Sequence, residues 1–372
     1  MDAVGIVFAD SYDVALEGIV KRRALAAVPF GGRYRVIDFV MSNMANAGII
    51  NVGIIVTQKY RSLVRHLRGG EDWDLNRKRS GVAMLTPFSF EGGGTAYKNR
   101  LEALQANITY LRETDEKYVL MTSCNYVGNI DFEKMLNYHI KSGARYTCMY
   151  TERPINKDSE VESTQIKIAS DGTVVDIIVD NKMSEDLHIT PNAYITDRES
   201  LIRDLEYSEK EHLESLRLDL IRPLLRDSSV KGYKAQEPIL FLDTPSSYLL
   251  SNLALLDRKT RDAIFHVEDR PIATRVKDSA PAKYGNRAWT HNSLIADDTL
   301  IEGEVLNSII FRGVHIKQGA KVENSVIMQD STIGEGAELN YVVLDKNVIV
   351  NDGRQLSAYI THPFYLGHRT VI

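Results

Sequence analysis

Aliphatic residues recur at every sixth position in the last part of the chain, and this repeat constrains the fold more than any other feature. The spacing joins Ile295 with Ile301; Ile310 with Ile316 and Val322; Ile327 with Ile333 and Leu339; and Val343 with Ile349. A six-residue period is typical of a left-handed parallel β-helix, in which each coil has three short faces. A β-sandwich of short strands is the alternative, and the sustained spacing argues against it.

The region before the repeat alternates between strand-like and helix-like patterns. Four short runs are apolar almost throughout and rich in β-branched and aromatic residues, which is typical of strands buried on both faces. They read AVGIVFA, NVGIIVT, KYVLMTS and ARYTCMY. Strands alternating with helices predict an α/β domain with a mostly parallel, Rossmann-like sheet. Ligands bind such sheets at the carboxyl ends of the strands, so we expect the chemistry just after Phe8, Ser123 and Tyr150.

The helical periods have recognisable ends. One helix is expected to stop at Gly48, and another to run from Asp131 to Gly143, because glycine often follows the last helical residue. A third helix is predicted over residues 95–114, with Thr95 as its N-cap.

These patterns divide the chain into three parts. A nucleotidyltransferase-like α/β domain is expected over 1–258, a linker with little periodicity over 259–290, and the β-helix over 291–372. A solenoid exposes the coil at its end and one of its side faces unless something packs on them, so we also expect assembly into oligomers.

Composition excludes several classes of function. The net charge of −5 is too small to indicate a nucleic-acid or membrane partner. Cys124 and Cys148 lie in apolar runs and are expected to be buried thiols in a reducing cytoplasm. We find no secretion signal and no apolar run of membrane-spanning length. The nine histidines fall in neither HxH nor HxxxH spacing, so no metal site is expected from them.

Five features occur together in the order and spacing of one enzyme family. They are VPFGGRYRVIDFVMSNMANAGI (28–49), GGTA (93–96), YVLMTSCNY (118–126), APAKYG (280–285) and the β-helix. Together they resemble the glucose-1-phosphate adenylyltransferase family over essentially the whole chain. The resemblance implies a reaction that converts ATP and glucose-1-phosphate to ADP-glucose and pyrophosphate with Mg²⁺, in glycogen biosynthesis.

The loop after the first strand departs from the family pattern. Catalytic members carry a glycine-rich loop there, whose backbone N–H groups approach the triphosphate. This chain has Asp10, Asp13 and Glu17 instead, and its first glycine after the strand is Gly18. One carboxylate ~4 Å from a phosphate charge costs about 4 kcal/mol at an effective dielectric constant of ~20. We therefore expect only a vestigial nucleotide site, near Ala9, Asp10, Gly93, Gly94 and Thr95.

Three basic residues follow this loop, and two more lie in the FGGRYR string. We expect Lys21, Arg22 and Arg23 to pair with the acids of the loop. The resemblance places Arg33 and Arg35 near the site where relatives bind anionic activators, so both are candidates for holding an anion. Ion pairing or packing between domains is an equally good interpretation of these two arginines.

A second departure concerns the metal. Where catalytic members have a magnesium-binding aspartate, this chain has Asn125, whose side chain offers only a neutral carbonyl. Asp243 matches the family's second metal-binding aspartate, although Asp–Thr–Pro–Ser is also a typical helix start. We expect no intact catalytic site, no bound cofactor and no metal in this chain.

The combination resembles the regulatory D-type subunits of the family, which form mixed tetramers with a catalytic C-type subunit and raise its activity. The resemblance thus implies a hetero-oligomeric partner, and it allows self-association and a sugar-phosphate or nucleotide effector. Two other functions stay open at this point. One is an active adenylyltransferase with a rearranged site, and the other is a hexapeptide acyltransferase that would use His315.

Overall fold

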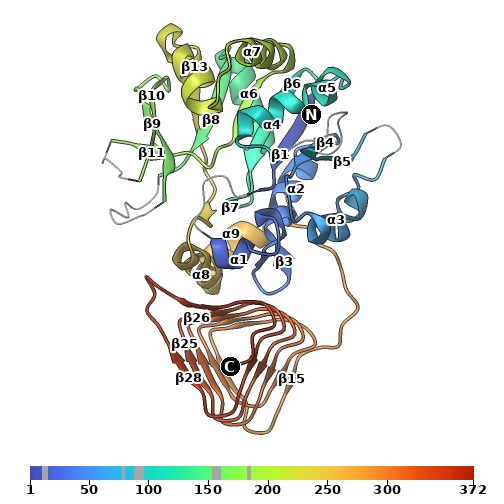
Figure 1. Ribbon diagram of the computed structural model, residues 1–372, viewed down its shortest axis with the longest axis vertical. Helices are drawn as coiled ribbons and strands as arrows, with labels where there is room; N and C mark the ends of the chain where they lie inside the picture. The colour runs from blue at the N-terminus through green and yellow to red at the C-terminus, as the bar shows by residue number, and fades with distance from the viewer. Residues whose placement is uncertain (11–15, 78–79, 88–95, 153–160, 182–185) are drawn as a thin grey trace.

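Figure 1 shows a computed structural model that describes residues 1–10, 16–77, 80–87, 96–152, 161–181 and 186–372. An α/β domain lies above a triangular β-helix, and a long connection joins them along one side. Within the described part of the chain, no helix has both the length and the apolar character that crossing a membrane requires.

A seven-stranded mixed sheet forms the centre of the α/β domain. Its order is β13 (Val230–Lys234), β8 (Tyr146–Tyr150), β12 (Tyr194–Asp197), β6 (Tyr118–Ser123), β1 (Ala3–Phe8), β4 (Val52–Ile55) and β5 (Val82–Leu85). Neighbouring strands are parallel except for β12, which is antiparallel to β6 and to β8. The predicted strands correspond to β1, β4, β6 and β8, so the largely parallel α/β sheet is confirmed.

Helices cover both faces of this sheet. Alternate residues of β1 pack into two different clusters: Val7 lies with α2 (Val36–Asn46) and α6 (Phe132–Ser142), whereas Ile6 lies with α4 (Arg100–Ala106) and α7 (Arg198–Lys210). A short α5 (Ile108–Arg112) follows α4. The other α-helices of the described residues are α1 (Glu17–Val20), α3 (Arg61–Leu67), α8 (Pro245–Leu253) and α9 (Arg258–Phe265). A separate three-stranded sheet contains β9 (Ser163–Ile168), β10 (Val174–Asp180) and β11 (His188–Ile189).

Two predicted helix ends are confirmed and one is wrong. Gly143 ends α6 in the left-handed conformation, and Gly48 has a φ of 72° just after α2. The third helix does not begin as early as residue 95. The helix begins at Arg100, because the Asn99 side chain accepts a hydrogen bond from the N–H of Glu102. It also breaks at Asn107, whose side-chain amide donates to the carbonyl of Ala103.

The C-terminal part consists of three five-stranded parallel sheets wound as a left-handed β-helix (Figure 1). The first sheet contains β15 (Lys283–Tyr284), β18 (Leu300–Ile301), β21 (His315–Ile316), β24 (Thr332–Ile333) and β27 (Ile349–Val350). The second contains β16 (Trp289–His291), β19 (Glu304–Leu306), β22 (Lys321–Glu323), β25 (Glu338–Asn340) and β28 (Gln355–Ser357). The third contains β17 (Leu294–Ile295), β20 (Ile309–Ile310), β23 (Val326–Ile327), β26 (Val342–Leu344) and β29 (Phe364–Leu366). Between α9 and β15 the chain forms no helix or strand.

In the last coils, the inward-facing positions depart from the six-residue repeat. Most paired residues on successive coils, such as Val326 and Val343, are 17 positions apart, one fewer than three steps of six, although Leu294 and Ile309 are 15 apart. The inward position therefore shifts by one residue at every third step. Leu344 and Val350 lie in the β-helix core, whereas Ile349 is 44% exposed and Val343 faces away from that core.

The third sheet of the β-helix is covered by the α/β domain. Ile309, Val326 and Val343 point outward from their coils, yet each is completely buried in the same cluster as α2 and η1 (Leu25–Ala27). The two parts of the chain therefore share one continuous apolar core.

Candidate functional site

The first candidate residue, Asp10, is tied to the neighbouring strand. β1 ends at Phe8, and the N–H of Ala9 continues the ladder by donating to the carbonyl of Ile55. One carboxylate oxygen of Asp10 accepts hydrogen bonds from both the backbone N–H and the hydroxyl of Thr57, which follows β4. Burial raises the pKa of Asp10, and the bonds from Thr57 and the charge of Lys59 partly oppose that rise.

A cavity of about 240 Å³ lies beside this carboxylate. Its lining consists of Asp10, Val20, Arg23, Ala24, Thr57, Gln58, Lys59, Ala96 and Tyr97. It sits at the carboxyl ends of β1 and β4, where a parallel sheet binds ligands. Gly93, Gly94 and Thr95 lie outside the described residues, as does Asp13 in the loop after β1.

The structure brings the two family metal positions together. Asn125 precedes β7 (Tyr126–Val127), and Asp243 follows β14 (Leu240–Phe241); because these strands pair antiparallel, both residues lie at the same end. The Asn125 amide donates to a carboxylate oxygen of Asp243, with 3.3 Å between Nδ2 and Oδ1. The predicted helix start after Asp243 is also confirmed, because Thr244 caps α8 and Pro245 is its first residue.

This pair does not fit a magnesium ion. Mg²⁺ requires several oxygen ligands in near-octahedral geometry, and anionic oxygens are preferred. Here Asn125 presents its N–H to Asp243, so the position between the two side chains is held by an amide hydrogen. The Oδ1 of Asn125 is buried and has no hydrogen-bond partner within the described part of the chain. Among the described residues, we also find no group of three or more His, Cys, Asp or Glu side chains able to hold a metal.

Among the described residues, Arg23 pairs with Asp345, a partner that was not predicted, and Asp13 of the β1–α1 loop lies outside the part of the chain that the structure describes. Both carboxylate oxygens of Asp345, in the turn after β26, lie 2.6 Å from Nη2 of Arg23. Arg23 is 6% exposed and Asp345 is 2% exposed, so this ion pair is buried between the α/β domain and the β-helix. Because 322 positions separate the two residues, no local pattern could have indicated the pair.

The two candidate anion-binding arginines have different surroundings. Arg33 is exposed, and its guanidinium lies 5.8 Å from the centre of the Tyr34 ring. Arg35 precedes α2, and its Nη1 donates to the carbonyl and the hydroxyl of Ser62. Burial lowers the pKa of Arg35 to about 10, and neighbouring cations add to the effect.

Arg35 belongs to a cluster of cations at the junction of the two domains, which we call the seam cluster. Burial first, and then the charges of Arg35 and Arg23, lower the pKa of Lys346 to about 7. Lys346 directly follows Asp345, which offsets part of this charge. The seam cluster comprises Arg23, Arg35, Arg275, Lys277 and Lys346. The carboxylates of Asp38, Asp330 and Asp345 offset part of this charge, and the excess of cations favours an anionic ligand.

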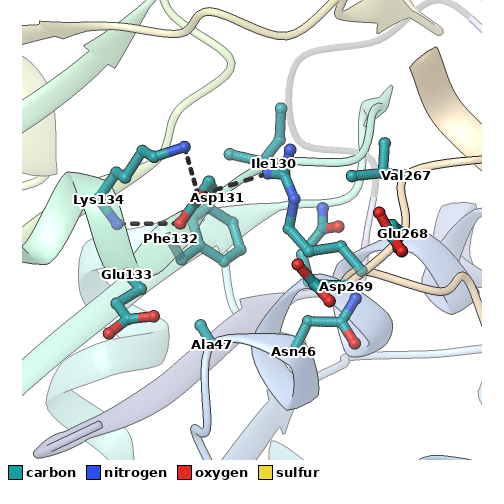
Figure 2. Close-up of a pocket in the computed structure, with 12 residues that line it drawn as sticks. Asn46, Ala47, Ile130, Asp131, Phe132, Glu133, Lys134, Val267, Glu268 and Asp269 are labelled. Atoms are coloured by element: carbon teal, nitrogen blue, oxygen red, sulfur yellow. Dashed lines mark hydrogen bonds and ion pairs between the residues drawn. The ribbon is translucent and has the colours of Figure 1, made fainter.

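Figure 2 shows a second cavity, of about 370 Å³, on another part of the α/β domain. It lies between the end of α2, the start of α6 and the residues after α9. Asp131 caps α6 and forms ion pairs with Lys134 and Arg270, and Arg270 also pairs with Glu237. None of its lining residues belongs to the predicted site.

Some residues that line the cavity beside Asp10 were not predicted, although one could have been. Thr57 directly follows the strand-like run NVGIIV, so the rule that ligands bind at the carboxyl edge identifies it. Tyr97 and Lys59 carry no comparable signal in the sequence. His315, the acyltransferase candidate, is on β21 and its Nε2 lies 2.8 Å from a carboxylate oxygen of Glu302.

Comparisons with known proteins agree with this architecture. Residues 15–178 match the family model "Nucleotidyl transferase", and residues 276–358 match the model "GlmU-like, C-terminal hexapeptide". The fold and these two matches define a nucleotidyltransferase-type protein with a hexapeptide β-helix.

Individual relatives narrow the class. The chain is 35% identical to the glycogen biosynthesis protein GlgD of Geobacillus stearothermophilus over 86% of this chain and 82% of that protein. It is 29% identical to GlgD of Bacillus subtilis over the same shares of the two chains. It is 30% identical to a glucose-1-phosphate adenylyltransferase of Clostridium botulinum, over 85% of this chain and 82% of that protein. The chain belongs to the family that comprises glucose-1-phosphate adenylyltransferases and GlgD proteins.

Proposed function

We propose that this chain is a regulatory, catalytically impaired subunit of glucose-1-phosphate adenylyltransferase in glycogen biosynthesis. It would assemble with a catalytic C-type subunit of the same family and raise that partner's activity. The observation that carries the proposal is the hydrogen bond from Asn125 to Asp243 at the family's metal position. Membership of the family and the similarity to two GlgD proteins support it.

Two features account for impaired catalysis. Nucleotidyl transfer needs a cation to neutralise the charge that develops on the reacting phosphate, and the Asn125–Asp243 pair supplies a single carboxylate. The carboxylate of Asp10 adds negative charge beside the cavity at the end of β1. Both features disfavour a polyphosphate with its magnesium.

A subunit without chemistry of its own can still regulate by binding. If it binds the active arrangement of a catalytic partner more tightly than the inactive one, it shifts the partner's population toward activity. The retained α/β domain and β-helix supply the surface for such an assembly.

The direct test compares the purified chain alone, a catalytic C-type subunit alone and their mixture, with ADP-glucose formation as the readout. We expect no turnover above background from this chain alone, and a higher rate in the mixture than in the catalytic subunit alone. Size-exclusion chromatography with light scattering would show a mixed oligomer. Turnover at the level of a catalytic subunit would instead favour the alternative, an active adenylyltransferase with a rearranged site. An unchanged rate on mixing would contradict the regulatory role.

The seam cluster supports a further part of the proposal, an anionic effector such as a sugar phosphate or a nucleotide. An anion bound near Lys346 would stabilise its charged form and raise its pKa from about 7, so binding near pH 7 would take up protons. Calorimetry in buffers with different ionisation enthalpies measures this uptake. Arg35→Gln should weaken binding, whereas Arg33→Gln, which changes an exposed residue, should have a smaller effect.

A further inference from the structure

Gly18, the first glycine after β1, packs against the β-helix. A Cβ atom at Gly18 would lie 2.7 and 2.8 Å from two ring carbons of Tyr365, so only glycine allows this ring to approach. Gly18 lies in α1, directly after the loop that follows β1. Tyr365 lies on β29, the last strand of the β-helix. In this chain, the glycine serves a contact between domains.

The hydroxyl of Tyr365 has one hydrogen and two acceptors within reach. Its oxygen is 3.0 Å from the carbonyl oxygen of Gly18 and 2.9 Å from a carboxylate oxygen of Asp345. Burial and the charge of Asp345 raise the pKa of Tyr365, so the hydroxyl keeps its hydrogen at neutral pH. A hydroxyl donates one full hydrogen bond at a time, so the two acceptors compete for it.

Arg23 decides how strongly Asp345 competes. Its guanidinium holds both oxygens of the Asp345 carboxylate, and Arg23 also lines the cavity beside Asp10. Asp345 also accepts from the N–H of Lys346, whereas the Gly18 carbonyl has, besides the Tyr365 hydroxyl, only the longer hydrogen bond of 3.4 Å from the N–H of Lys21, so Gly18 is the less well supplied acceptor while Arg23 is in place. An anion that draws Arg23 away leaves the buried carboxylate with the N–H of Lys346 and the Tyr365 hydroxyl as its donors, so the carboxylate then competes more strongly for the hydroxyl hydrogen.

We propose that Tyr365 is a two-position switch that couples the seam cluster to α1. With Arg23 on Asp345, the hydroxyl donates to Gly18 and holds α1 against the β-helix. With an anion on Arg23, the hydroxyl donates to Asp345 and releases Gly18. The inference rests on the effector site proposed above. It adds the contact through which an anion bound at the seam cluster would affect α1, beside the cavity at Asp10.

Amide hydrogen exchange of the full-length chain tests the switch. The readout is the segment from Leu16 to Ala24, which contains the hydrogen bond from the N–H of Val20 to the carbonyl of Leu16. Inorganic pyrophosphate is the probe, and its binding is measured separately by calorimetry. The test variant is Tyr365→Phe, and the matched control is Tyr359→Phe in the same coil, where the tyrosine is 79% exposed.

The expected results are specific. Tyr365→Phe should exchange about five-fold faster over this segment without pyrophosphate, as loss of one hydrogen bond predicts. Pyrophosphate should accelerate exchange in the wild type and in Tyr359→Phe, and have little further effect in Tyr365→Phe.

Three outcomes would overturn the switch. Equal exchange in the two tyrosine variants would show that the hydroxyl does not hold α1. Bound pyrophosphate without a change in wild-type exchange would refute the coupling and leave the anion site standing. Absence of pyrophosphate binding would remove both the trigger and the anion site, while the mixing assay would still decide the regulatory role.

Discussion

Restoring the second carboxylate at the family's metal position should make the chain respond to divalent cations. Asn125→Asp would place a carboxylate opposite Asp243, where 3.3 Å now separates the amide nitrogen from the acceptor oxygen. Two unit charges at that distance repel by about 5 kcal/mol at an effective dielectric constant of 20. The fold relieves most of this by keeping one proton on the pair, so the variant's shared carboxyl should titrate well above the usual aspartate range.

The sign of the pH dependence follows from this proton. Between the unfolded pKa of about 4 and the raised folded value, the folded variant binds more protons than the unfolded chain. Its stability relative to the wild type should therefore fall as pH rises through that window. Mg²⁺ or Mn²⁺ replaces the proton, and a cation present at 100 times its dissociation constant stabilises the folded state by about 2.7 kcal/mol.

Thermal unfolding at neutral pH, with EDTA and with added Mg²⁺ or Mn²⁺, measures the response. We expect the variant to have a lower Tm than the wild type in EDTA and to recover by several degrees with either cation. The matched control is the swap Asn125→Asp with Asp243→Asn, which keeps one carboxylate and one amide and should show no cation response. A variant as indifferent to cations as the wild type and the swap would refute the reasoning.

Three further predictions concern stability. Arg23→Met should lower the free energy of unfolding in urea by roughly 3–5 kcal/mol by leaving Asp345 buried and unpaired, and adding Asp345→Leu should recover much of the loss; a cost below about 1 kcal/mol would contradict the buried pair. Burial lowers the pKa of His139 to about 4, so stability should be lost as pH falls from about 6.5 toward 4, by on the order of 3 kcal/mol, and His139→Gln should abolish that slope. Leu344→Ala should cost about 2–5 kcal/mol and Ile349→Ala well under 1; the reverse order would disprove the 17-residue register.

The architecture could be predicted because its signals are local and repeated. Six-residue spacing and strand–helix alternation each involve many residues, so single exceptions do not hide them. The outward-facing positions of Val343 and Ile349 could not be predicted, because a six-residue rule does not show where a coil is shorter than 18 residues, as it is between Val326 and Val343. The shift of one residue becomes visible only when the pairing of strands on successive coils is known.

Single contacts between distant segments were harder to predict. The family resemblance pointed to Asn125 and Asp243, but the hydrogen bond between them depends on the pairing of β7 with β14. The nearest acids in the sequence did not indicate Asp345 as a partner for Arg23, because burial at the domain junction favours Asp345. Likewise, Gly18 is explained only when Tyr365 is seen against it.

The apolar cluster between the two domains gives a structural reason to retain the α/β domain even if the chain is catalytically impaired, as we propose. Ile309, Val326 and Val343 form an aliphatic row on the outside of the β-helix, and the α/β domain keeps water from it. Cutting the chain between α9 and β15 would expose that apolar row on one fragment and the apolar surface that covers it on the other. Catalytic residues of such a protein can be substituted one at a time, but the α/β domain has to be kept because it covers the β-helix.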